Sequence, residues 1–547
     1  MSKVIEIPQG KRSFRYRFFE ILPFVLSVSM VALLPLLSWI SPVLGSIYLL
    51  LIVIMNLVKA VGIAYRMIQG QGVVKASVKV DWQERLRELD NASVSLEKHT
   101  GHPRKEYAYN DHVENLRRIV GHQQEYPKST DIWHAVIVTM YNEGADVLVP
   151  TLESVSNVSF DKKHMIVVLA YEERGGEEAE KTAFEIEKQF KNKFGYFELA
   201  KHSKDIPGEV IGKGGNITNA GRAVQKLVER ENIPVENVIV TTLDSDNKPH
   251  ACYFDQVAYE FIVREDRQNL AYQPVSLFTN NIWDAPAVTR VVATTNSFWN
   301  LICTMRPHML RNFASHSQPL QPLIGMNFWS TRTIVEDGHQ YWRSLFYLDG
   351  KYEVIPIRAP IYQDAVLSDT LWKTLKAQWI QLRRWDYGAS DTAYVADYLF
   401  SKKRKISFIS LFPKFFRRLD GDVTLAAVAP IIMFGGWVPL IFNFESRDLL
   451  SRNLPIVVSY IQTVAAIGIL ISIVLSLKML PPKPKNCKGK PKIIMVLQWI
   501  ISPIISVVYS SFCAFYSQAR LAFGLYMEKF DVTQKTVKKH DEEVVKE

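Results

Sequence analysis

Two aspartates, Asp244 and Asp246, stand one residue apart and directly follow the apolar run 238–243. Carboxylates with this spacing on a turn can share a divalent cation, and Mg²⁺ or Mn²⁺ prefers such hard oxygen ligands. A metal held there could bridge a diphosphate and offset the charge that develops as the diphosphate leaves. Alone, this spacing is more often part of a solvated turn. Its position at the end of an apolar strand favours the metal site.

Asp364 follows Gln363 and precedes a helix that we expect to begin at Ser368. An aspartate in this position is either a helix cap or a general base, and the local sequence alone favours the cap. As a base, Asp364 would need only hydrogen-bond reach to the hydroxyl group that it deprotonates.

Gln381, Arg384 and Trp385 are spaced i, i+3 and i+4 on an expected helix, so they share one face of that helix. The planar guanidinium of Arg384 suits a diphosphate, and the Trp385 indole offers an apolar plane to a sugar ring. The alternative, a core tryptophan beside an exposed arginine, is equally supported by these residues alone.

Lys213 stands before two glycines and Asn216, ahead of an expected helix over 217–229. Backbone amides freed by glycines, together with a lysine, can cradle a phosphate, although a simple helix-start turn has the same pattern. The segment matches neither the Walker motif nor the dinucleotide fingerprint, so the sequence does not support an ATPase or a dehydrogenase.

The elements around these residues alternate between strand and helix. Short β-branched runs predict strands at 135–140, 165–170 and 238–243, and helices are expected at 145–155, 177–190 and 217–229. This alternation predicts an α/β domain with a parallel sheet and helices on both faces. Ligands of such sheets bind beyond the carboxyl ends of the strands. The candidate residues at these ends are Tyr141, Asn142 and Glu143, then Tyr171, Glu172 and Glu173, then Asp244 and Asp246.

Apolar segments flank this polar region at 21–40, 43–65, 424–444, 454–480 and 493–524. Each is long enough to cross a bilayer core of about 30 Å. The first two follow one another without a small-residue cleavage site, so they are expected to be retained helices and not a signal peptide. The sequence therefore predicts a multi-pass membrane protein.

The net charge is +10, and the basic residues cluster beside the apolar segments. Five basic residues precede the first segment, and five lysines lie between the fourth and the fifth. The positive-inside rule places both flanks, and with them the polar region 66–420, in the cytosol. No nucleic-acid-binding motif accompanies the basic balance, so a nucleic-acid partner is not expected. The four cysteines lack metal-ligand spacing.

The remaining segments complete the expected organisation. Short amphipathic helices are expected at 82–89 and 112–120, and the alternating basic and aromatic residues 402–418 predict a helix in the membrane interface. The expected order is a basic N-terminus (1–20), two transmembrane helices (21–65), a cytosolic linker (66–131), a catalytic domain (132–400), an interfacial helix (401–420), C-terminal membrane segments (421–526) and a tail (527–547).

In this order the motifs resemble those of the membrane-integrated family 2 glycosyltransferases, the group of cellulose, chitin and hyaluronan synthases. The similarity runs from about Ile132 to Trp385 and returns near the C-terminus. It implies a GT-A-like (Rossmann-like) cytosolic domain inserted between transmembrane helices of the plasma membrane. It also implies a hexosyltransferase that uses Mg²⁺ or Mn²⁺ to transfer a sugar, with inversion, from a UDP-sugar to a carbohydrate acceptor, and processive polysaccharide synthesis is the favoured interpretation.

The resemblance also implies roles for single residues. Those implied near the donor are Tyr141 and Glu143 in the uridine pocket, Glu172 in place of an Asp pair, Lys213 near the diphosphate, and Asp244 and Asp246 on the metal. Those implied near the acceptor are Asp364 as catalytic base and Gln381, Arg384 and Trp385 as the Gln-x-x-Arg-Trp motif. Phe530, Val532, Thr533 and Lys535 are similar to a gating loop that closes over bound nucleotide.

Departures from the family pattern leave the acceptor open. Gln363 stands where an acid is usual, and residues 324–328 lack the usual cysteine. Transfer of a single sugar to a lipid, as in ceramide glucosyltransferases, is the first alternative, and a non-catalytic transporter or scaffold is the second. Membrane lipids and accessory export proteins are the other expected partners. A gating tail must be cytosolic, so the segment 493–524 must re-enter or form a tight hairpin, broken at Pro503, unless the gating similarity is false. Re-entry is the favoured expectation.

Overall fold

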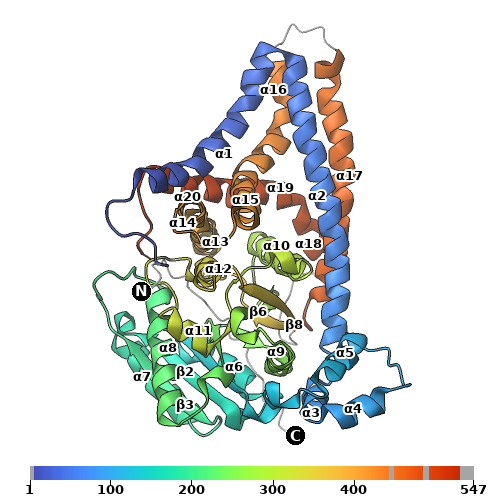
Figure 1. Cartoon of the computed structure of the whole chain (residues 1–547). Helices are drawn as coiled ribbons and strands as arrows, with labels where there is room; N and C mark the ends of the chain where they lie inside the picture. The colour runs from blue at the N-terminus through green and yellow to red at the C-terminus, as the bar shows by residue number, and fades with distance from the viewer. Residues whose placement is uncertain (1–4, 443–448, 484–491, 530–547) are drawn as a thin grey trace, which may run out of the picture.

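A mixed sheet lies beneath a bundle of long apolar helices in the computed structural model, which describes residues 5–442, 449–483 and 492–529 (Figure 1). The sheet has eight strands in the order β3-β2-β1-β4-β7-β6-β8-β5. The strands are β1 (Trp133–Met140), β2 (Met165–Glu172), β3 (Tyr196–His202), β4 (Val238–Leu243), β5 (Lys248–Pro249), β6 (Leu270–Phe278), β7 (Ser317–Pro319) and β8 (Glu353–Gln363).

One half of the sheet is parallel, as predicted. Strands β3, β2, β1 and β4 run in the same direction, and the predicted strands coincide with β1, β2 and β4. The other half is mixed, because β7 pairs antiparallel with both β4 and β6. The predicted parallel sheet is therefore confirmed for this half, and the other half departs from it. Pro274 in β6 and Pro356 and Pro360 in β8 interrupt the β-branched pattern that reveals the other strands.

Helices cover both faces of the parallel half. They are α6 (Ala145–Ser156), α7 (Gly176–Phe190), α8 (Lys213–Arg230) and α9 (Tyr253–Ile262). Successive side chains of a strand point to opposite faces, so Val136 of β1 joins the hydrophobic core that contains α6, α7 and α9. Its neighbour Ile137 joins the core that contains Ile217 and Val224 of α8. The polar candidate residues follow the carboxyl ends of β1, β2 and β4 directly.

The segment 66–131 is folded against this domain. It contains the end of α2 and three short helices, α3 (Trp82–Asp90), α4 (Ala92–His99) and α5 (Tyr109–Ile119). Trp82 and Leu86 of α3 share a hydrophobic core with residues of α9. The remaining helices of the sheet domain are α10 (Ala287–Thr304), α11 (Leu320–Gly325), α12 (Glu336–Tyr347), α13 (Leu371–Asp386) and α14 (Ser390–Leu399).

Four helices form the bundle, namely α1 (Phe14–Ile40), α2 (Pro42–Ser77), α15 (Phe408–Phe434) with its continuation α16 (Val438–Phe442), and α17 (Leu449–Met479). Leu34, Leu49, Ala427 and Leu454, one from each of these helices, meet in a single apolar cluster. At 1.5 Å per residue, the 36 residues of α2 extend about 54 Å, so this helix reaches beyond a bilayer core and into the sheet domain.

Among the described residues, four segments are long and apolar enough to cross a membrane: Phe14–Ile40, Pro42–Ser77, Phe408–Phe442 and Ile493–Ala522. These overlap the expected spans, and the remaining expected span, 454–480, falls in α17, whose apolar part among the described residues is Gly468–Met479. The expected interfacial residues 401–420 do not form a separate helix. The helix begins at Phe408 and continues to Phe434, with exposed Ile409 and Phe416 near its start.

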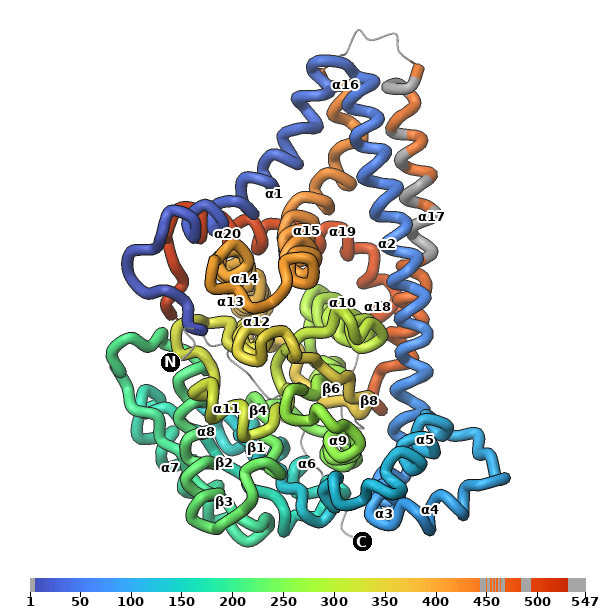
Figure 2. The backbone as a smooth tube through the Cα atoms, viewed as in Figure 1, coloured from blue at the N-terminus to red at the C-terminus, as the bar shows by residue number. Residues whose placement is uncertain are grey.

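The last apolar segment follows a different course from the bundle helices. It runs past the lower ends of α1 and α15 as α18 (Lys492–Leu497), α19 (Ser502–Ile505) and α20 (Phe512–Ala522), whereas α2 continues further down (Figure 2). A 3-10 turn precedes Pro503 and a π-helical turn follows α19, so the segment is broken where the proline predicts a break. It packs against α1, α10, α13 and α15, and the chain after it returns to the sheet domain.

Candidate active site

The acid turn after β4 meets the end of β8. The backbone N–H of Asp364 donates a hydrogen bond to Oδ2 of Asp246 over 3.0 Å. This contact follows from the pairing of β5 with β8, in which Lys248 lies opposite Tyr362. Asp246 is buried, whereas the side chain of Asp244 is 33% exposed. Two of the motifs, distant in the chain, therefore form one site.

Asp364 does not cap the following helix. Helix α13 begins at Leu371, and its cap is Thr370, whose side chain accepts a hydrogen bond from the backbone N–H of Lys373. The cap interpretation and the expected helix start at Ser368 are therefore wrong. Residues 364–370 form a non-helical connection whose first residue is held at the acid turn.

Lys213 lies beside the acid turn. It is the first residue of α8, and its Nζ atom lies 2.9 Å from Oδ1 of Asp244. The side chain of Asn216 donates to the carbonyl of Ala170 in β2 over 2.9 Å, which fixes the helix start at the sheet edge. A Cβ atom at Gly214 would lie 2.3 Å from the carbonyl oxygen of Ser330, so the backbone approach requires glycine.

Two acids that the sequence analysis did not single out, Glu336 and Asp337, join this cluster from the start of α12. Asp337 Oδ2 lies 3.3 Å from Nζ of Lys213. Burial by itself would lower the pKa of Lys213, but Asp244 and Asp337 raise it overall, so the lysine is charged. Burial and the neighbouring Asp337 raise the pKa of Glu336 to about 8, although Lys213 opposes this shift. The adjacent pair Glu336-Asp337 is the sequence signal for this part of the site. It does not stand at the end of a predicted strand, which is where candidate residues are expected.

The loop after β1 is tied to the same turn. Glu143 accepts a hydrogen bond from the backbone N–H of Tyr141 through Oε2 over 2.7 Å. Its Oε1 accepts from the hydroxyl of Ser245 over 3.0 Å. The predicted residues Tyr141 and Glu143 therefore lie next to the acid turn, and Glu143 is one of its supports.

Glu172, at the end of β2, is buried and already engaged. Its Oε2 accepts from Nη2 of Arg174 over 2.7 Å and lies 3.1 Å from Nδ1 of His202. Burial would lower the pKa of His202, but Glu172 and Glu209 raise it overall. A Cβ atom at Gly215 would lie 2.8 Å from the His202 ring, so this group lies directly under the start of α8.

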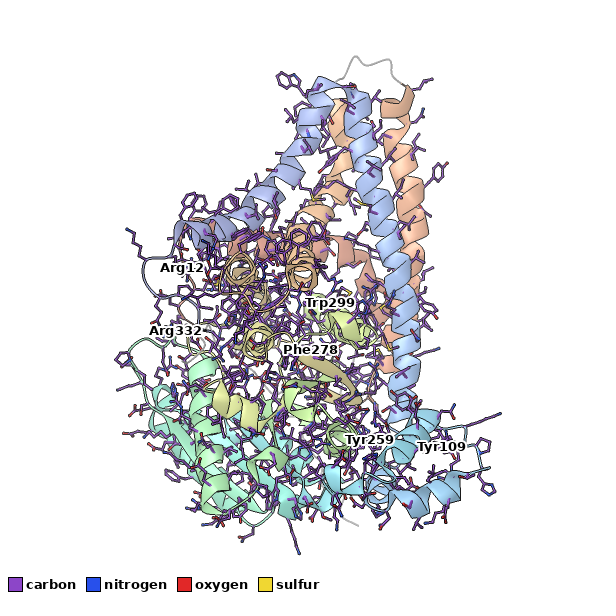
Figure 3. The ribbon with its side chains drawn as sticks, viewed as in Figure 1. Arg12, Tyr109, Tyr259, Phe278, Trp299 and Arg332 are labelled. Atoms are coloured by element: carbon purple, nitrogen blue, oxygen red, sulfur yellow. The ribbon has the colours of Figure 1, made fainter. Side chains whose placement is uncertain are left out.

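Helix α13 carries the predicted residues Gln381, Arg384 and Trp385. Trp385 is 38% exposed and is not a core residue. Its ring centroid lies 6.0 Å from that of Phe278, the last residue of β6, which is labelled in Figure 3. Phe278 pairs with Gln363 in the sheet. Gln381 accepts a hydrogen bond from Gln378 over 3.0 Å. The partly exposed Trp385 ring therefore lies near Phe278, which pairs with the residue before Asp364.

Asn280 connects the two sides. Its backbone N–H donates to the carbonyl of Gln363 over 3.1 Å, and its side chain donates to the carbonyl of Asp246 over 3.0 Å. The loop after β6 therefore holds the acid turn, the end of β8 and the Phe278–Trp385 pair in one arrangement.

The C-terminal segment returns to this region. The backbone N–H of Ile211 donates to the carbonyl of Glu528 over 3.2 Å, and Lys529 forms a parallel bridge with Ile211, two residues before Lys213. A cavity of about 270 Å³ lies between this segment, α13 and α20; Arg383, rather than Arg384, lines it, together with Arg520 and Lys529. The predicted gating residues Phe530, Val532, Thr533 and Lys535 lie outside the described residues.

The donor atoms of the acid turn suit a hard divalent cation. Asp244 and Asp246 offer carboxylate oxygens, and Mg²⁺ or Mn²⁺ favours such ligands. Lys213 already occupies one oxygen of Asp244. A second cation on that carboxylate is therefore favourable mainly when an anionic ligand arrives with it.

No known protein-family model and no curated protein matches the sequence. Among solved structures, the chain is similar to the mannosyltransferase PcManGT from Pyrobaculum calidifontis in complex with GDP-Man and Mn²⁺, at 14% identity over 71% of this chain and 98% of that one, with a TM-score of 0.38. It is also similar to residues 1–349 of S. aureus TarS in complex with UDP-GlcNAc, at 13% identity over 66% and 95% of the two chains, with a TM-score of 0.32. At these TM-scores the likeness is partial and carries no conclusion about activity.

Proposed function

We propose that the chain is a membrane-bound glycosyltransferase that transfers a sugar from a UDP-sugar to a carbohydrate acceptor, with inversion, at the cytosolic membrane face. The observation that supports this most strongly is the cluster of Asp244, Asp246, Asp364 and Lys213 at the carboxyl end of the parallel strands. Acids and a charged lysine gathered at that edge, below an exposed tryptophan, suit a diphosphate donor and a sugar acceptor.

On the donor side, Lys213 would bind the diphosphate, and Asp244 and Asp246 would hold Mg²⁺ or Mn²⁺. When bound, the metal supplies Lewis-acid stabilisation of the leaving diphosphate. Arg384 of α13 would add a planar donor for the phosphate oxygens. Tyr141 and Glu143 border the turn and would contact the nucleoside, whereas Glu172 would act indirectly by supporting the start of α8 through His202.

On the acceptor side, Asp364 would deprotonate the attacking hydroxyl group. Asp337 is a second candidate, because its Oδ1 is buried and has no hydrogen-bond partner among the residues that the structure describes. Either carboxylate needs hydrogen-bond reach to the hydroxyl in the bound complex. Trp385 and Phe278 would orient the acceptor ring, and orientation lowers the barrier by making attack intramolecular in effect.

The product side faces the bundle. The hydroxyl of Ser517 in α20 donates to the carbonyl of Arg383 in α13 over 2.6 Å, so the acceptor helix packs directly on the last apolar segment. This contact supports an acceptor held at the membrane surface, and we propose that the product is a polymer. The described chain ends at Lys529, beside Ile211, and this position supports the proposed gating role of Phe530, Val532, Thr533 and Lys535.

A donor screen followed by product sizing tests this function. The full-length protein, purified into lipid nanodiscs, is given each common UDP-sugar with Mg²⁺ or Mn²⁺, and released UDP is measured. The proposal predicts metal-dependent UDP release with one donor and a product that lengthens with time. A single glycolipid product would support the lipid-acceptor alternative, and no UDP release with any donor would contradict catalysis.

A further inference from the structure

A second polar cluster lies in the three short helices that follow α2. Glu88 of α3, His99 of α4 and His112 of α5 place their ligand-type atoms within 4.8 Å of one another. Nε2 of His99 lies 2.9 Å from Oε1 of Glu88, and Nε2 of His112 lies 2.9 Å from Oε2 of the same carboxylate. Both imidazoles are buried, and the Glu88 side chain is 13% exposed. Three side chains from three helices therefore converge on one point.

Two tyrosine hydroxyls hold the other nitrogens of the imidazoles. The hydroxyl of Tyr109 lies 3.0 Å from Nδ1 of His99 and donates its proton to the carbonyl of His102 over 2.7 Å. A hydroxyl has a single proton to donate, so Nδ1 of His99 must donate to Tyr109. The hydroxyl of Tyr259 lies 2.9 Å from Nδ1 of His112. Figure 3 labels both tyrosines, on α5 and on the neighbouring α9.

The contact between Nε2 of His99 and the Glu88 carboxylate requires a proton or a metal ion between the two atoms. With its proton on Nδ1, His99 directs the lone pair of Nε2 at a carboxylate oxygen, and two acceptors attract one another only through a shared proton or metal ion. Arg85, one turn earlier on α3, does not supply the charge, because its guanidinium donates to Glu106 and to the carbonyl of Tyr107.

We propose that Glu88, His99 and His112 form a zinc site. Two imidazoles and one carboxylate are a ligand set that Zn²⁺ takes up with an exogenous fourth ligand, and metal-bound histidines are held through their second nitrogen as these are. Tetrahedral bonds of about 2.0–2.1 Å place two ligand atoms roughly 3.3 Å apart, so the side chains separate by a few tenths of an ångström on binding. A cavity of about 300 Å³ beside His99 gives water access.

The zinc site would lie where the helix bundle is connected to the sheet domain. Helix α2 leads directly into α3, and Tyr259 belongs to α9 in the core of the sheet domain. Zinc at this position would connect three helices that are each too short to be stable alone. Zinc would stabilise the folded state in proportion to its occupancy.

Metal analysis of the full-length protein tests this site. The protein is purified in detergent without a histidine tag, stripped with a chelator, dialysed against dilute zinc and measured by elemental mass spectrometry. The proposal predicts about one zinc ion per chain in the wild type. His99→Gln removes a ligand and should retain at least about tenfold less zinc. Tyr109→Phe, which keeps the ring and removes the hydroxyl, should weaken zinc binding by about 10–100-fold.

Two controls separate this site from other metal sites. His122→Gln removes an exposed histidine of the same region and should retain full zinc. The double variant Asp244→Asn/Asp246→Asn removes the acid turn as a metal site and should also retain zinc. Zinc-free wild-type protein, or equal zinc in wild type and His99→Gln, would show that a proton fills the position. If His99→Gln does not fold, a Co²⁺ titration of Tyr109→Phe against wild type decides, and equal absorption spectra and affinities would overturn the proposal.

Discussion

The backbone amide of Asp364 donates to the Asp246 carboxylate over 3.0 Å, which joins residues 118 positions apart in the chain. The pairing of β5 with β8 and the side chain of Asn280 hold this contact in place. The geometry of the acid turn therefore depends on the end of β8. A change of the Asp364 side chain can affect the proposed chemistry without removing the contact to Asp246, because this contact uses the backbone of Asp364.

We predict that Asp364→Asn lowers sugar transfer by about 100-fold to 10,000-fold, the range of a lost general base. The affinity for UDP should stay within a few-fold of wild type, because the backbone contact to Asp246 is preserved. Initial rates and calorimetric UDP titration measure the two quantities. The paired variant Asp337→Asn should mainly change UDP affinity, through Lys213. Near-normal turnover in Asp364→Asn together with loss in Asp337→Asn would assign the base to Asp337.

A divalent metal at the proposed site would compete with Lys213 for Asp244, so metal and nucleotide should bind cooperatively. We expect Mn²⁺ to bind more tightly when UDP is present, because the diphosphate draws the ammonium group away and adds negative charge. Lys213→Met should raise the Kd for UDP by about tenfold or more, since hydrogen bonds to charged groups contribute about 1.5–3 kcal/mol. The same variant should bind Mn²⁺ more tightly without UDP. Equal Mn²⁺ affinity with and without UDP in the wild type would contradict this competition.

Trp385 is expected to act on the acceptor alone. Trp385→Ala should raise the KM for the acceptor while hydrolysis of the UDP-sugar in the absence of acceptor continues at its normal rate. Trp372 on the same helix is 76% exposed and provides the matched control, because Trp372→Ala should change neither quantity. Parallel loss of acceptor-dependent transfer and donor hydrolysis in Trp385→Ala would indicate a structural role.

Much of the parallel half of the sheet could be predicted from the sequence, because β1, β2 and β4 are buried apolar runs with polar residues at their ends. The sequence predicts that the helix begins at Ile217, because Gly214 and Gly215 lower helix propensity. Helix α8 begins at Lys213 instead, where the two glycines allow close packing. The contact between Lys213 and Asp337 could not be predicted, because it joins segments 124 residues apart through the irregular chain before α12.

The stability of the protein should depend on the protonation of Glu336. Burial and Asp337 raise its pKa from 4.5 to about 8, so the folded state binds a proton that the unfolded state has lost at neutral pH. This contribution is complete below about pH 4.5 and is lost as the pH rises through about 8. Glu336→Gln should therefore raise the Tm relative to wild type near pH 9, with a smaller difference near pH 5. A constant Tm difference across this range would contradict the raised pKa.

The proposed function depends on a metal bound by the acid turn, and UDP release by the Asp246→Asn variant is the measurement that tests this dependence. The variant and the wild type are compared in nanodiscs with the active donor and Mn²⁺, with the exposed Asp266→Asn as control. Loss of a metal-binding carboxylate should lower UDP release by about 100-fold or more, as chelation should for the wild type, whereas Asp266→Asn should match the wild type. Undiminished, chelator-resistant UDP release by Asp246→Asn would contradict a metal-dependent transferase built on this turn.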